Sequence, residues 1–156
     1  MYSASIIAYA FVKKGIDSGN PISQMKLQKM VYFSHGLHLA LHHRPLIKDA
    51  IQAWKFGPVI PEIYREYKLY GSGPIIDFKW AKNPFFPEDN PLKELDYDAI
   101  ETINSTWAAL SDWDAVQLSN WTHLDGSPWQ KYYKEGVSDI IIPQAEMEEY
   151  FKQYVN

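Results

Sequence analysis

Two stretches near the N-terminus carry apolar or small residues around most of a helical circumference, which indicates helices that belong to a core. The first stretch runs from about Ser3 to Lys14, and a helix that is apolar nearly all round is typical of a buried position. The second begins at Ser23, which follows a Pro-containing turn and has the side chain of an N-cap, and runs to about His42. We therefore expect two adjacent core helices at the N-terminus.

Two glycines mark special positions in these helices. Gly15 directly follows the first helix and is available to terminate it, since glycine is common just past the last helical residue. Gly36 lies in the middle of the second helix, where glycine costs ~1 kcal/mol relative to alanine. The simplest explanation is that another backbone approaches closely at Gly36.

The rest of the chain alternates short helical patterns with turn signals. A period-two pattern predicts a strand within Ala50–Phe56, and Gly57-Pro58 is expected to break it. The other expected elements are a helix from Pro61 to before Gly71, helices opening at Asp96 and at a capping box of Ser111 with Asp114, a short helix at Pro128–Tyr133, a strand at Val137–Ile142 and a last helix from Pro143. The fold class is therefore mainly α (α+β): one compact helical domain spanning residues 1–156, with six or seven helices and a small two- or three-stranded β element.

The segment from Ser72 to Leu92 contains several prolines with scattered Gly, Asn and Asp, which is typical of a long connector. Its aromatic residues distinguish it from a free linker. We expect them to hold the connector against the core and to offer anchors for a partner; they are Phe78, Trp80, Phe85 and Phe86.

Composition excludes several classes of protein. Cysteine is absent, so disulfides, thiolate zinc sites and cysteine nucleophiles are excluded, and the absence fits a cytoplasmic location. No apolar run approaches the ~20 residues that span a bilayer, so no membrane association is expected. The formal net charge is −4 and the pI is about 5.7, which makes nucleic acid an unfavourable partner.

The charge is distributed unevenly along the chain. Residues 1–70 hold nine Lys/Arg and four Asp/Glu, a net +5, whereas residues 71–156 hold six and fifteen, a net −9. Such polarity can steer a charged protein partner and raise its association rate. It equally fits a folded domain whose two halves neutralise each other.

Three histidines are the candidate metal ligands. His35, His38 and His42 lie on one side of the predicted second helix, within about 60° of one another, and imidazoles at this spacing can share a metal ion. However, His38 falls on the apolar face, and no acidic ligand or HxxxH pattern with a glutamate base accompanies the three. Packed histidines are the favoured interpretation and no cofactor is expected; a small His-dependent metalloprotein is the alternative.

A second constellation is Thr122-His123-Leu124-Asp125 with Ser127. A histidine near serine and aspartate suggests a hydrolytic triad, but no G-x-S-x-G turn presents a nucleophile. We expect Thr122 and His123 to bond to backbone at a helix end. Residue chemistry alone therefore indicates a helical domain that is not an enzyme.

Two blocks of sequence resemble a known family. The chain reads KLQKMVYFSHGLHLA at Lys26–Ala40 and AWKFGPVIPEIYREYKLYG at Ala53–Gly71, and a TH…PW element follows at Thr122-His123 and Pro128-Trp129. Together these resemble the Panacea domain of the SocA-like antitoxins, over about Ser3 to Trp129 and the terminal helix. One departure is Met30, where the family usually has leucine.

The resemblance implies a non-enzymatic antitoxin of a type II-like toxin–antitoxin system, often phage-associated. Its partner would be a cognate protein toxin encoded by the adjacent gene, neutralised by direct binding. The alternative that the family implies is an adaptor that delivers the toxin to an AAA+ protease. A homodimer is compatible with either role.

The positions that match the family pattern are expected to form scaffold more than contact surface. They are Leu27, Lys29, Tyr32, Trp54, Gly57, Pro58, Val59, Tyr64, Gly71, His123, Pro128 and Trp129. The candidate partner surface combines the N-terminal helix, an exposed basic side and the aromatic connector, with the residues Lys26, Lys29, Phe78, Trp80, Phe85 and Phe86.

Overall fold

The computed structural model describes residues 1–77 and 90–155. Within these residues the chain is mainly helical, with seven α-helices and one two-stranded antiparallel sheet, which confirms the predicted fold class. The elements are α1 (Ala4–Asp17), α2 (Gln24–His42), β1 (Gln52–Trp54), β2 (Gly57–Val59), α3 (Pro61–Tyr67), α4 (Tyr97–Leu110), α5 (Ala115–Thr122), α6 (Pro128–Tyr132) and α7 (Gln144–Phe151), with short 3-10 turns at Lys68–Tyr70, Pro91–Glu94 and Lys152–Tyr154.

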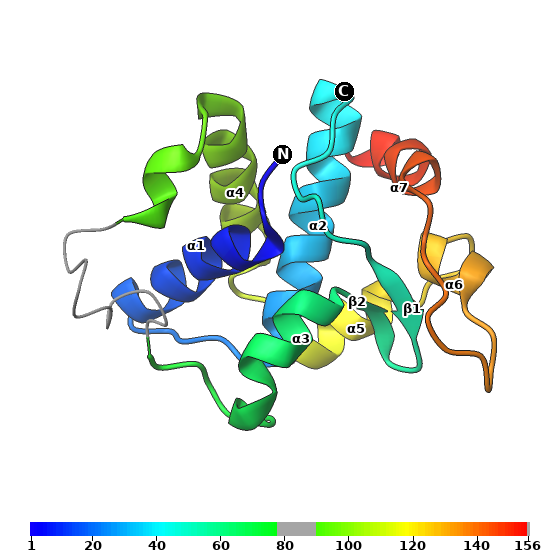
Figure 1. Ribbon diagram of the computed structural model, residues 1–156, viewed down its shortest axis with the longest axis horizontal. Coiled ribbons are helices and arrows are strands. Elements are labelled where there is room, and N and C mark those ends of the chain that lie inside the picture. The colour runs from blue at the N-terminus through cyan, green and yellow to red at the C-terminus, as the bar shows by residue number, and fades with distance from the viewer. Residues whose placement is uncertain (78–89, 156) are drawn as a thin grey trace.

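Helix α2 is the centre of the fold. It packs against α1, α4, α5, α7 and the hairpin, and the other helices surround it (Figure 1). Its N-cap is Ser23, whose side chain accepts a hydrogen bond from the Lys26 amide. At its C-terminus the His43 amide donates to the Leu39 carbonyl, and His43 adopts a left-handed conformation with φ of 56°. Because α2 is covered on nearly every side, residues of many polarities along it are buried.

Gly36 is explained by a side chain, and the expectation of an approaching backbone is wrong. A Cβ added at Gly36 would lie 2.2 Å from ring carbons of Phe151. Phe151 belongs to α7, and its ring packs edge-on against Tyr32 and Phe33 with centroids 5.5 Å away in both cases. Glycine thus lets an aromatic ring sit directly on the α2 backbone.

Gly15 does not terminate α1, which continues to Asp17. Gly15 is buried, and a Cβ there would lie 3.0 Å from the Asn20 carbonyl oxygen. The turn beyond the helix uses Gly19 instead, with φ of 74°. Gly15 therefore admits the loop that leads into α2.

The predicted first strand is confirmed, but Gly57-Pro58 does not break the sheet. These residues open β2, which pairs antiparallel with β1, so that Trp54 lies opposite Gly57. Lys55 and Phe56 form the two-residue turn between the strands. Gly57 has φ of 120°, a backbone conformation that residues with a side chain disfavour. This conformation lets the chain reverse its direction directly after the turn.

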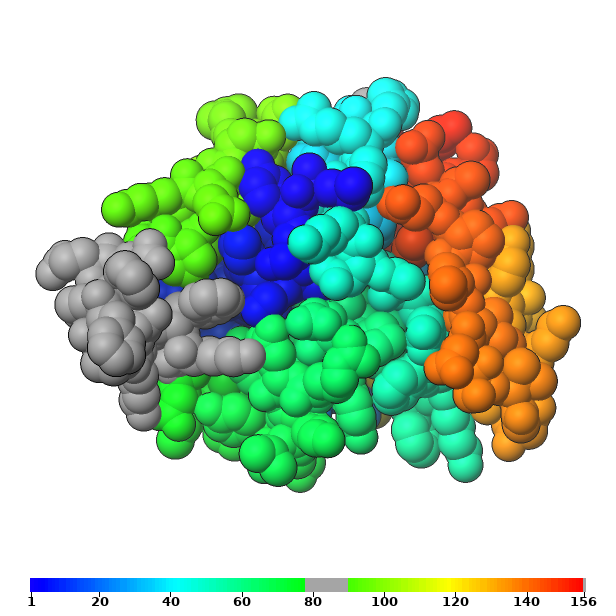
Figure 2. Space-filling model, in the orientation of Figure 1, coloured from blue at the N-terminus to red at the C-terminus, as the bar shows by residue number. Residues whose placement is uncertain are grey.

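The segment predicted as a strand at Val137–Ile142 forms no regular strand. It runs extended beside β1: the Ala53 amide donates to the Ile140 carbonyl at 2.8 Å, and the Ile142 amide donates to the Ile51 carbonyl at 2.8 Å. The pairing amounts to one isolated antiparallel bridge, between Gln52 and Ile141. Figure 2 shows this orange segment lying against the cyan-green hairpin region.

Two helix starts show how local sequence sets the boundaries. Asp96 caps α4 by accepting from the Ala99 amide at 2.8 Å, as predicted. The capping box before α5 pairs Asp114 with Gln117, so the predicted pairing of Ser111 with Asp114 is wrong. Among the helices that the structure describes, none has the length and hydropathy to cross a bilayer.

Candidate functional site

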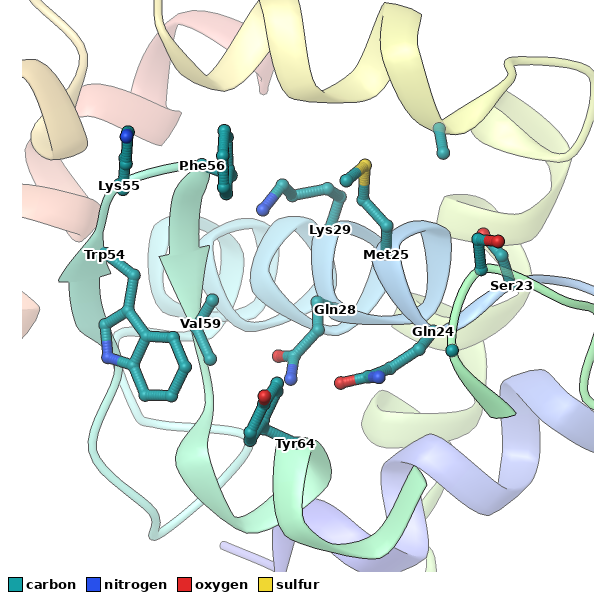
Figure 3. A pocket seen from close by; sticks show the side chains of 13 residues that line it. Ser23, Gln24, Met25, Gln28, Lys29, Trp54, Lys55, Phe56, Val59 and Tyr64 are labelled. Carbon is teal, nitrogen blue, oxygen red and sulfur yellow. The ribbon is translucent and has the colours of Figure 1, made fainter. Parts of the chain in front are cut away.

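A pocket of about 560 Å³ lies between the N-terminal half of α2, the hairpin, α3 and the start of α5 (Figure 3). Its volume is in the range of sites that hold a ligand or an anchoring side chain. Its described lining residues are Ser23, Gln24, Met25, Gln28, Lys29, Trp54, Lys55, Phe56, Val59, Tyr64, Gly71, Ser72 and Ala115.

The pocket brings together the two sequence blocks that carry the family resemblance. Ser23 starts α2, so Met25, Gln28 and Lys29 fall on one helical face, since residues three and four apart are neighbours on a helix. The tight hairpin then places Trp54 and Val59 beside that face. Scaffold positions that lie far apart in the sequence therefore form the walls of one cavity.

Gln28 joins α2 to the start of α3, a role that the sequence analysis missed. Its side-chain oxygen accepts from the Ile60 amide at 2.8 Å, and its side-chain nitrogen donates to the Ile60 carbonyl at 3.1 Å. Both groups of Ile60 are thereby satisfied where the chain passes from β2 into α3. A polar residue on a helix that is covered on nearly every side is the signal that points to such a bond, because buried polar groups are nearly always hydrogen-bonded.

Lys29 is the charged residue at the base of the pocket. It is 2% exposed, and its Nζ donates to the Pro58 carbonyl at 3.1 Å. A Cβ on Gly57 would lie 2.7 Å from this Nζ, so glycine leaves room for the ammonium. Burial lowers the pKa of Lys29 to about 8, which leaves the side chain mostly protonated at neutral pH.

The prediction that Lys26 and Lys29 form an exposed basic side is wrong, because both are buried. Lys26 reaches the Ser111 carbonyl at the end of α4. Burial lowers the pKa of Lys26, while the nearby carboxylates of Asp112 and Asp114 oppose the shift. The two lysines lie three residues apart on the covered N-terminal part of α2, and their long stems reach carbonyls of neighbouring elements.

Exposed apolar side chains surround the pocket. Phe56 at the hairpin turn is 66% exposed, and Met25 and Tyr64 are also exposed. The Nζ of Lys55 lies 5.7 Å from the centroid of the Phe56 ring. Exposed apolar side chains gathered around a hollow are typical of a site that contacts another molecule. We call Met25, Phe56 and Tyr64 the pocket rim.

The TH…PW element contacts the hairpin through Trp129. The Trp129 indole donates to the Trp54 carbonyl at 2.6 Å, and the His123 ring lies 3.9 Å from the Trp129 ring, centroid to centroid. Thr122 Oγ1 donates to the Ser119 carbonyl at 2.7 Å, and His123 Nδ1 also contacts this carbonyl. The predicted backbone bonds at this helix end are confirmed.

Other scaffold positions belong to the core. Leu27 and Pro58 are buried, and Tyr32 is also buried, which raises the pKa of its hydroxyl.

Gly71 has φ of 58° and follows the turn after α3. The remaining candidate partner residues lie outside the described residues: they are Phe78, Trp80, Phe85 and Phe86.

Two of the three candidate metal ligands hold hydrogen bonds within the fold, and the third lies near a carboxylate. His35 Nδ1 accepts from the Ile47 amide at 3.3 Å, and His38 Nδ1 lies 3.0 Å from Thr102 Oγ1. Burial lowers the pKa of each of these two histidines to about 4. His42 lies 3.7 Å from Asp98. Over residues 1–77 and 90–155, no three His, Cys, Asp or Glu side chains are grouped to hold a metal ion.

The pocket combines an apolar surface with a buried ammonium. Its described lining residues include hydroxyl, amide and ammonium groups but no aspartate, glutamate or histidine. Most of the pocket surface is apolar, and Lys29 places a charged group in it. Such a site can accept an apolar group and an anion together.

Comparison with known proteins places the chain in a family. The model of the antitoxin SocA-like Panacea domain matches residues 27–130, a range that contains ten of the thirteen described lining residues of the pocket. Antitoxin SocA of Caulobacter vibrioides is 34% identical over 130 residues, which cover 81% of this chain and 68% of that protein. No solved structure matches the chain. The chain therefore belongs to the antitoxin SocA-like family and carries its Panacea domain.

Proposed function

We propose that this protein is a cytoplasmic antitoxin of a type II-like toxin–antitoxin system that neutralises a cognate protein toxin by direct binding. Membership of the antitoxin family supports the general role. The observation that carries the binding step is the pocket with its exposed apolar rim, built from the two blocks of the family pattern. The proposed toxin contact is centred on this pocket.

The rim supplies the kind of residue that dominates protein interfaces. A few aromatic side chains usually account for most of the binding energy, and they lie near the centre of the contact. Phe56 extends from the two-residue turn of the hairpin and is 66% exposed to solvent. Burying it against a toxin would stabilise the complex with little reorganisation of the antitoxin.

Co-expression with the product of the adjacent gene tests this function. That product alone should stop growth, and this protein should restore growth and co-purify with it. A harmless neighbour, or toxicity that persists beside this protein, would contradict the proposal. The half-life of the toxin, measured in the same strains, should stay unchanged; a shortened half-life would replace sequestration with delivery to an AAA+ protease.

Two matched variants locate the contact. Phe56→Ser removes the aromatic residue of the rim, whereas Tyr97→Ser removes one that is 76% exposed at the start of α4, away from the pocket. Phe56→Ser should weaken toxin binding by about 2 kcal/mol or more, and Tyr97→Ser should leave it unchanged. Equal effects of the two substitutions would move the interface away from the pocket.

A further inference from the structure

Lys29 is a buried cation whose charge the described part of the chain does not fully compensate. An ammonium carries three donors, and among the described residues the Lys29 Nζ donates to one acceptor, the Pro58 carbonyl. None of the ion pairs formed by these residues includes Lys29. Burying a charge without an opposite charge is costly. A buried charge in this state suggests an oppositely charged group supplied by a binding partner.

The neighbouring lysine provides an internal comparison. Lys26 is also buried, but Asp112 and Asp114 lie close enough to favour its charged form. Burial alone accounts for the shift at Lys29. Among residues 1–77 and 90–155, the same helix thus carries one buried lysine with acidic neighbours and one without, and the second lysine is the one that lines the pocket.

The position of Lys29 restricts which kind of anion could compensate its charge. In Figure 3 its side chain extends from α2 toward the hairpin, and its ammonium lies between Phe56 and the helix. The surrounding walls include Met25 and Val59. An anion that reaches Nζ must therefore enter between apolar side chains, which favours an anion that is attached to an apolar group.

We infer that the pocket binds a segment of the toxin that presents an acidic side chain beside a large apolar side chain, with the Lys29 ammonium donating to the carboxylate and the rim enclosing the apolar group. The inference rests on the proposed antitoxin function. Charge complementarity supports it, since the described lining includes two lysines, Lys29 and Lys55, and no acidic residue.

Other anions fit this pocket less well. A phosphate group is usually held by several charged or backbone donors at once, whereas the described lining offers a single buried ammonium inside apolar walls. A nucleic acid backbone would in addition need a broad basic surface. One carboxylate matches one buried ammonium in charge.

Small probes test the chemistry of the pocket without the toxin. The probes are 3-phenylpropionate, which joins an apolar ring to a carboxylate, and 3-phenylpropanamide, its uncharged counterpart. Affinities for the full chain are measured by NMR titration. The wild-type protein should bind the acid at least tenfold more tightly than the amide, and the shifted resonances should belong to residues that line the pocket.

Two variants assign the preference to Lys29. Lys29→Met keeps an unbranched side chain but removes the charge, and Lys93→Met removes the same charge from an exposed residue outside the pocket. The acid-over-amide preference should fall below twofold in Lys29→Met and persist in Lys93→Met. Circular dichroism verifies that both variants fold. Equal binding of acid and amide to the wild-type protein, or a preference that survives in Lys29→Met, would overturn the inference.

The toxin itself separates this inference from the proposed function. Binding and growth rescue are compared for the wild-type protein, Lys29→Met and Lys93→Met. At least tenfold weaker toxin binding by Lys29→Met alone supports the carboxylate contact, and one Asp→Asn or Glu→Gln change in the toxin should reproduce it. A wild-type protein that does not bind the toxin refutes the proposed function, whereas equal binding by Lys29→Met refutes only the carboxylate contact.

Discussion

The two halves of helix α2 bury titratable side chains in opposite ways. In the C-terminal half, His35 and His38 are buried with hydrogen-bond partners, and their lowered pKa keeps them neutral at pH 7. In the N-terminal half, Lys29 is buried with a pKa of about 8, so it stays mostly charged at that pH. In the histidine half, His35 and His38 find their hydrogen-bond partners within the fold. In the lysine half, Lys29 keeps a charge beside the pocket. Burial of a polar group therefore has a structural meaning in one half and points to a ligand in the other.

The largest expected effect on stability is at the contact between Gly36 of α2 and Phe151 of α7. Phe151→Ala should lower the free energy of unfolding by about 3–5 kcal/mol, since it removes a fully buried ring. Gly36→Ala should also destabilise the wild-type protein, because its Cβ would meet the Phe151 ring. Urea denaturation of both variants and of the double variant measures the coupling.

The double variant is the control for that contact. With the ring removed, Gly36→Ala should become stabilising by up to about 1 kcal/mol, since alanine is the better helix former. An equal cost of Gly36→Ala in both backgrounds would contradict the assigned packing.

Acid should destabilise the histidine half. The folded pKa of His35 is about 4, below the ordinary value of 6.5, so the unfolded chain takes up a proton first as pH falls. The stability contributed by neutral His35 is thus present above pH 6.5 and is lost toward pH 4, by about 3 kcal/mol. Urea denaturation at pH 7 and pH 4 measures the loss, and it should be smaller in His35→Gln. An identical loss in that variant would assign the acid sensitivity to other groups.

Lys29 should show the same direction of pH dependence as His35, with stability rising with pH, but over a more alkaline range. Its folded pKa of about 8 lies below 10.5, so the cost of burying the charge is present in full below pH 8 and disappears as pH rises to 10.5. Lys29→Met should therefore be more stable than the wild-type protein at pH 7 by about 2 kcal/mol, allowing for the lost bond to Pro58. This advantage should vanish by pH 10.5.

Denaturation curves of Lys29→Met and Lys55→Met at both pH values provide the comparison. Lys55 is exposed, so its substitution should change stability little at either pH. A Lys29→Met protein that is less stable than the wild type at pH 7 would show that the ammonium supports the fold.

The smallest expected effect is on the pocket rim. Phe56→Ser should change the free energy of unfolding by no more than about 0.5 kcal/mol, because the ring is mostly exposed. Thermal unfolding beside Tyr97→Ser checks this. A large loss in Phe56→Ser alone would make the ring part of the hairpin's own packing and weaken its assignment to a partner contact.

Local features were the ones that could be predicted from the sequence. The caps Ser23 and Asp96 and the prolines that open α3 and α6 act within one helical turn, so the residues themselves set these boundaries. The capping box before α5 was misassigned because Asp114 can be read with Ser111 or with Gln117, and both pairs have the same spacing. The hairpin turn was missed because Lys55-Phe56 lacks the glycine or asparagine that usually signals one.

Features that depend on contacts between distant residues could not be predicted. Periodicity shows that Lys26 and Lys29 lie near one another on a helix, but it does not show that the end of α4 and the hairpin cover them. The pocket was missed for the same reason, although its residues Lys29, Trp54 and Tyr64 were already recognised as part of the family pattern.

The amino-acid sequence thus determined the helical class, most element boundaries and the family, because periodicity, caps and motif order are properties of neighbouring residues. Tertiary structure alone decided that Gly36 seats the Phe151 ring, that two lysines are buried, and that the motif blocks enclose one cavity. The physical reason is that burial, and with it the free energy of a charge, depends on which surfaces the folded chain brings together.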